Sequence, residues 1–286
     1  MGIALGLAAA LSWGLADYSA AMASRRIGSM RVVLGFHVVA TVVVALAVLA
    51  SGEAGRLADA DPLDFALLGA VGCGSYLAFY RALAIGPISV VSPIVSGYAA
   101  VTVVLAIALL GDRPSIGQTL AILVAMLGVV LASSDLAQLR SQHRPPLAGI
   151  GFALAAMALL GGFVFGVAYH SEALGWLVPI FLARACTTIF LLLVAARTGE
   201  LDVPDRSPSL LGTIAVLALL DTGGYVAFNL GVRHADTSIV ATASAPYAVI
   251  PIVMGVAVLH ERPAPVQWLG VALVLGGLVL LGAVSS

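Results

Sequence analysis

Long apolar runs, separated by short polar connections, make up most of the sequence. A helix that crosses a bilayer needs about 20 predominantly apolar residues, and ten runs of that kind can be placed along the chain. The expected spans are residues 3–22, 32–51, 63–85, 88–110, 115–133, 147–170, 176–196, 209–231, 239–259 and 265–284. The sequence therefore predicts an all-α integral membrane protein with ten transmembrane helices.

Composition supports a lipid environment for these runs. Hydrophobic residues make up 61% of the 286 residues and charged residues only 9%, which is far from the composition of soluble domains. With 13 basic residues, all arginine, and 14 acidic ones, we expect no nucleic-acid partner. The first apolar run lacks the basic region of a signal peptide, so we expect it to be kept as a membrane span.

The polar connections predict where the chain divides. Residues 111–114 (Gly-Asp-Arg-Pro) and 260–263 (His-Glu-Arg-Pro) carry turn and helix-start residues between expected spans. The longest connection, residues 134–146, is polar and ends in two prolines. We therefore predict a first five-helix repeat over residues 1–140 and a second over residues 141–286.

The two halves share an internal repeat at a constant offset of 149 residues. Identical residues at this offset include the pairs Gly74/Gly223, Tyr76/Tyr225, Phe79/Phe228, Tyr98/Tyr247, Arg113/Arg262 and Gly128/Gly277. The register is kept through two helix connections, which indicates a true repeat. Because each half has an odd number of expected spans, the second half enters the membrane from the opposite side. Such inverted repeats are typical of secondary transporters, whose sites lie near the midplane at the repeat interface.

Short motifs in this order resemble the ten-helix EamA-type exporters of the drug/metabolite transporter superfamily. They are Ser12-Trp13-Gly14, residues 111–114, residues 260–263, and the glycines Gly128 and Gly277. The resemblance implies a multi-pass permease of the bacterial inner membrane that exports small metabolites, often amino acids. It also implies a central cavity lined mainly by helices 1, 3, 4, 6, 8 and 9. One departure is Asp112, since the family pattern usually has glutamate at that position.

Ionisable residues inside apolar runs are costly and are therefore candidates for function. Asp221 lies midway along the eighth expected span, and Tyr225 and Asn229 follow at helical spacing. The repeat aligns Asp221 with Gly72, so only the second half carries this carboxylate. We expect Asp221 to face a substrate in the cavity. The alternative is that these polar side chains only hydrogen-bond between neighbouring helices.

The other expected binding residues extend this polar and aromatic surface. Trp13 and Asp17 share one face of the first span, although Asp17 is near the helix end and could instead pair with Arg25. His37 and Arg184 are expected to satisfy structural partners, although His37 could also carry a proton. The full predicted substrate-binding set is Trp13, Asp17, Tyr76, Phe79, Tyr80, Tyr98, Asp221, Tyr225, Asn229 and Tyr247.

The sequence favours a secondary active transporter that exports small metabolites, foremost amino acids, by alternating access. No Walker A, GxSxG or HExxH motif occurs, so we expect no ATP-driven transport, no enzyme activity, no metal site and no cofactor. A proton gradient could supply the energy, with Asp17, Asp221 and His37 as titratable candidates. We expect a monomer in the lipid bilayer with a small-molecule substrate. The alternatives are a non-transport binding or assembly protein and, third, a lipid-modifying membrane enzyme.

Overall fold

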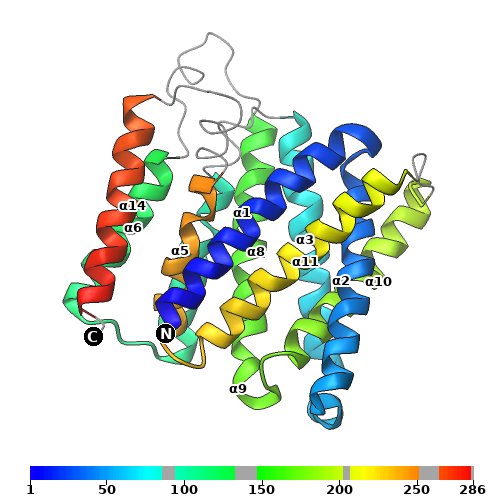
Figure 1. Cartoon of the computed structure of the whole chain (residues 1–286), viewed down its shortest axis with the longest axis horizontal. Helices are drawn as coiled ribbons and strands as arrows, with labels where there is room; N and C mark the ends of the chain where they lie inside the picture. Colours follow the sequence, from blue (N-terminus) through cyan, green and yellow to red (C-terminus); the bar gives the residue numbers. More distant parts are fainter. Residues whose placement is uncertain (86–93, 133–146, 202–206, 251–263, 285–286) are drawn as a thin grey trace.

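The structure, a computed structural model, describes residues 1–85, 94–132, 147–201, 207–250 and 264–284, and all regular elements in these residues are helical. The elements are α1 (Gly2–Ile27), α2 (Ser29–Ser51), η1 (Glu53–Asp59), α3 (Pro62–Ile85), α5 (Tyr98–Leu105), η2 (Ala106–Leu110), α6 (Ile116–Ala132), α8 (Leu147–Tyr169), α9 (Ser171–Leu174), α10 (Val178–Thr198), α11 (Pro208–Gly231), α12 (Thr237–Ser244), η3 (Ala245–Val249) and α14 (Pro265–Val284) (Figure 1).

The described helices agree with the predicted spans in type and position. Helices α2, α3, α8, α10, α11 and α14 contain the six segments that are long and apolar enough to cross a membrane, and three shorter apolar helical segments lie in α1, in α6 and around α5. The predicted spans 88–110 and 239–259, and the predicted boundary at residue 140, extend into residues outside the described ranges. The all-helical prediction is confirmed for the described residues, and the count of ten stays a prediction.

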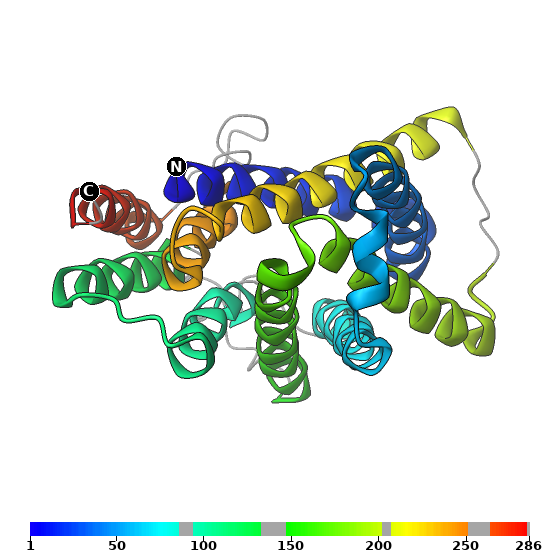
Figure 2. The ribbon, with the colours of Figure 1, turned by 90° about the horizontal axis from the view of Figure 1, so that it is seen from below.

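Helix packing follows the internal repeat. Helix α1 packs along α11, and the equivalent helix α8 packs along α3; likewise α10 packs on α3 and α2 on α11. The equivalent helices α2 and α10, α5 and α12, and α6 and α14 pack against each other. Exchanging each helix for its counterpart returns the same pairs, so the packing is pseudo-twofold symmetric. Figures 1 and 2 show α6 and α14 together at one end of the molecule and α2 and α10 at the other.

Two equivalent residues of the repeat contact each other between α2 and α10. Thr41 of α2 and Thr188 of α10 differ by 147 residues, the same offset that relates Gly14 to Gly161, and their Oγ1 atoms are hydrogen-bonded at 2.9 Å. The hydroxyls are partly buried, so the bond satisfies polar groups between apolar helices. The pair fixes the register of α2 against α10.

Asp112, in the connection of residues 111–114, also connects the two halves. It follows η2 of the first half, and its Oδ2 accepts a hydrogen bond of 2.8 Å from the backbone N–H of Ser238 in the first turn of α12. The first amides of a helix have no partner within the helix, and a negative charge there is favourable. Asp112 of the first half therefore caps α12 of the second half.

Candidate substrate cavity

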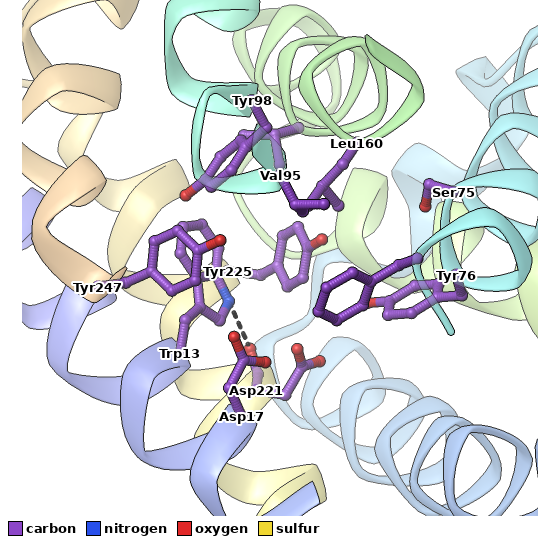
Figure 3. Close-up of a pocket in the computed structure, with 12 residues that line it drawn as sticks. Trp13, Asp17, Ser75, Tyr76, Val95, Tyr98, Leu160, Asp221, Tyr225 and Tyr247 are labelled. Atoms are coloured by element: carbon purple, nitrogen blue, oxygen red, sulfur yellow. Dashed lines mark hydrogen bonds between the residues drawn. The ribbon is translucent and has the colours of Figure 1, made fainter. Parts of the chain in front are cut away.

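A cavity of about 560 Å³, including its open mouth, lies between the two halves. The lining side chains come from α1, α3, α8, α11, η3 and the region of α5, which are the helices that the resemblance implied. They are Trp13, Asp17, Ser75, Tyr76, Phe79, Val95, Tyr98, Leu160, Val164, Asp221, Tyr225 and Tyr247 (Figure 3).

The cavity brings together eight of the ten side chains predicted to bind substrate. Tyr80 and Asn229 are not among its lining residues. The Tyr80 ring packs on Phe79 with centroids 5.4 Å apart. Asn229 is fully buried, and its Nδ2 donates a hydrogen bond of 3.3 Å to the carbonyl oxygen of Trp176. The structure therefore gives Asn229 a contact with the turn between α9 and α10, and not a position in the cavity lining.

Aromatic rings from both halves form one wall of the cavity. The centroid of the Trp13 ring lies 5.1 Å from that of Tyr225 and 6.3 Å from that of Tyr98, and both pairs are edge-to-face. Tyr98 in turn lies 5.5 Å from its repeat counterpart Tyr247. Such pairs hold large rings in defined positions. The result is a continuous aromatic surface from α1 through α5 to η3 and α11, which can stack against the apolar or aromatic body of a ligand.

Two carboxylates lie beside this wall, at one side of the cavity (Figure 3). Asp17 of α1 is exposed in the cavity, whereas Asp221 of α11 is only 8% exposed. A hydrogen bond of 3.3 Å from Trp13 Nε1 to the backbone carbonyl of Asp221 ties the two helices together at this level. The predicted proximity of acids and rings in the first and eighth spans is thus present in the geometry.

A buried ion pair lies behind the Asp221 carboxylate. The Arg184 Nη2 atom of α10 donates to Asp221 Oδ2, and the guanidinium carbon lies 5.0 Å from the centre of the Tyr225 ring. The Arg184 side chain is 3% exposed, and it does not line the cavity. We expected Arg184 to have a structural partner, but the sequence did not identify Asp221 as that partner. The only available signal was the presence of opposite charges in neighbouring spans.

His37 is the counterpart of Arg184 in the first half, at the offset of 147 residues. Its ring is 1% exposed and lies 4.6 Å from Tyr76, which is the counterpart of Tyr225. Each half thus places a basic side chain against the equivalent tyrosine. Asp221 has no acidic counterpart in the first half, where the equivalent residue is Gly72. Gly72 packs so closely on Thr187 and Phe163 that any side chain there would collide. The charge asymmetry of the site follows from this close helix contact.

Sequence comparison identifies the family of the chain. The EamA-like transporter family matches residues 1–134 and 140–283. The chain belongs to the EamA-like transporter family. The match confirms the resemblance and the two-repeat architecture, and membership in the EamA-like family indicates a multi-pass membrane transporter of small molecules.

Structural comparison agrees with this family on the fold. One solved crystal structure superposes with a TM-score of 0.77 over 99% of this chain and 96% of the other, at 17% sequence identity. At that identity the likeness establishes the fold of this EamA-like chain. No curated protein matches the chain by sequence.

Gly224 allows the Trp13 indole to reach its position in the cavity wall. A Cβ atom at residue 224 would collide with the indole, whereas one at Gly223 would meet only Ser12 Oγ, at 3.6 Å. We expect Gly224→Ala to displace Trp13 and to destabilise the protein by about 1–3 kcal/mol, as overpacking does. Gly223→Ala is the matched control and should have little effect. Thermal unfolding in detergent, with tryptophan fluorescence as the probe, measures both. Equal melting temperatures for the two variants would contradict this packing.

Proposed function

We propose that this EamA-like chain is a secondary active transporter that exports small metabolites, foremost amino acids, across the bacterial inner membrane. The observation that carries the proposal is a cavity, with an exposed acid and aromatic rings, whose walls come from both halves. A site between two related halves can be opened to either side of the membrane when the halves rock. We propose alternating access by a monomer, without a metal or other cofactor.

We further propose that the architecture is two inverted repeats of five spans, divided near residues 140 and 141. The symmetric exchange of helix pairs supports this arrangement. So does the opposite direction of α1 and α8, the first helices of the two halves (Figure 1). An inverted pair of repeats has the property that alternating access requires, since each half can take up the conformation of the other.

Counterflow in proteoliposomes tests the transport proposal. Vesicles loaded with an unlabelled amino acid, nucleoside or cationic drug should take up the labelled compound in a saturable way when it is a substrate. Tyr76→Ala removes a ring from the cavity and should lower this exchange about tenfold or more, given stacking energies of about 1–3 kcal/mol. Tyr169→Ala is the matched control, because Tyr169 is 50% exposed and is not a lining residue.

The same assay distinguishes a transporter from a non-transport binding or assembly protein. Saturable exchange supports a transporter. A compound that binds the purified protein but is never exchanged would instead favour a non-transport binding or assembly protein. Unchanged exchange in Tyr76→Ala would mean that the substrate binds elsewhere in the transporter.

Proton coupling would supply the energy for uphill export, and Asp17 is the strongest candidate to carry the proton. Asp221 is occupied by Arg184, and His37 is almost fully buried, whereas Asp17 is exposed in the cavity. Acidifying the interior of proteoliposomes should drive substrate accumulation above its external concentration. Asp17→Asn should abolish that accumulation, as should a protonophore. Wild-type uptake that ignores the imposed gradient would contradict coupling and indicate facilitated diffusion.

A further inference from the structure

We infer that the cavity selects organic amines that carry a positive charge and lack a free carboxylate. Asp17 is the counter-ion of the ammonium group, and the aromatic wall contacts the apolar part of the ligand. This inference rests on the transport function proposed above. Within the small metabolites proposed above, it favours amines of similar size and shape over the amino acids that were named first.

The first step of the argument is the charge of the cavity. Among the lining residues that the structure describes, only Asp17 and Asp221 are charged. Asp221 is neutralised by Arg184 from behind, and Asp17 forms no ion pair with any described side chain. Arg25, the alternative partner considered for Asp17, lies outside the side chains that the structure describes. The described lining therefore carries one negative charge without an ionic partner, at the exposed Asp17. A charge among mostly apolar and aromatic side chains is stabilised by an opposite charge, which a protonated amine brings.

The second step is that no cation among the described lining residues is available for a ligand carboxylate. The described lining contains no arginine or histidine. Two further nitrogens of Arg184, Nε and Nη1, have no partner within the described residues, but they are buried. Arg184 borders a separate small void of about 140 Å³ that Phe163, Val167 and Ile180 also line. A zwitterionic amino acid would thus place its carboxylate near two acids, without a cation.

The third step is the aromatic surface next to Asp17. Tryptophan and tyrosine faces attract ammonium groups, and tryptophan does so most strongly. Trp13 is on the same helix as Asp17, one turn away, and it contacts Tyr98 and Tyr225. An amine with a ring can therefore pair with the acid while its body stacks on the wall. The same surface offers a carboxylate only weak attraction.

Matched compounds test the inference on the purified full-length protein. Tryptamine and tryptophan, or phenethylamine and phenylalanine, differ only by the carboxylate, and tryptophanamide keeps the bulk of tryptophan without its negative charge. We expect the amine and the amide to bind at least about tenfold more tightly than the amino acid in isothermal titration. Equal or tighter binding of the amino acid would overturn the inference, and so would the absence of binding by all three compounds. Weak binding of the amide would show that size, not charge, excludes tryptophan, and would also overturn it.

Variants of Asp17 test the source of the preference. Asp17→Asn should remove the preference for the amine, whereas Asp17→Glu should keep it. Size-exclusion chromatography of each variant shows whether it is folded. A preference that survives in folded Asp17→Asn would contradict the role of this acid.

Counterflow with the same compounds separates failure of this inference from failure of the transport function. Exchange of amino acids without any advantage for the amines would leave the transporter in place and overturn the amine preference. Tight, Asp17-dependent binding of amines without exchange would support the amine preference and overturn the transport function.

Discussion

Replacing Arg184 by glutamine, or Asp221 by asparagine, is expected to destabilise the protein by about 3–5 kcal/mol. Each change removes one partner of a buried pair and leaves the other charge uncompensated among apolar helices. Thermal unfolding in detergent measures the effect. Arg197→Gln is the matched control, because Arg197 lies in the last turn of the same helix, α10, and is exposed.

The double variant Arg184→Met with Asp221→Leu distinguishes a general packing defect from a charge effect. An apolar replacement of a whole buried pair is often close to neutral, because no charge remains to be desolvated. The double variant should therefore recover most of the stability that either single change loses. Losses that simply add would show that the two side chains act independently and that the ion pair has no energetic role.

Replacing Trp13 by alanine is expected to cost about 3–5 kcal/mol, which is the usual range for a buried large aromatic residue. The indole is 8% exposed, touches Tyr225 and Phe228, and donates a hydrogen bond to the Asp221 carbonyl. Trp268→Ala is the matched control, since Trp268 on α14 is 52% exposed.

Trp13→Phe separates the ring from its N–H group. It keeps most of the aromatic surface and loses the hydrogen bond, so its unfolding temperature should lie between those of the wild type and Trp13→Ala. Equal stability of Trp13→Ala and Trp268→Ala would contradict the central position of the indole.

The all-helical fold could be predicted because the bilayer permits few solutions. Backbone groups in lipid must be satisfied within the chain, so each long apolar run must form a helix. The repeat then allowed residues of different helices to be paired in advance. Tyr76 and Tyr225, or Tyr98 and Tyr247, were expected to share a site because their positions are equivalent, and each pair lines the cavity.

The positions of Asn229 and of the Arg184 side chain depend on helix rotation, which the sequence determined only in part. A helix turns by about 100° per residue, so a side chain four positions along is about 40° off the first and one eight positions along about 80° off. Tyr225 therefore stays beside Asp221 on the cavity side, and Asn229 turns toward Trp176.

The apolar lining residues could not be singled out from the sequence. Val95, Leu160 and Val164 lie in helical segments that are apolar on most sides. Their positions in the cavity result from how α5 and α8 pack together. Amphipathic periodicity, the usual signal for such residues, is weak in a helix that meets lipid on one side and protein on the other.

The hydrogen bond between Thr41 and Thr188 has a mechanical consequence. Because the two residues are equivalent, their contact would map onto itself in the alternating access that we propose, and the symmetry gives it no reason to break. The bond from Asp112 to Ser238 joins residues that are not equivalent, so the same exchange changes it. Under that proposal the threonine contact would persist between α2 and α10, whereas the aspartate cap would form in only one of the two conformations.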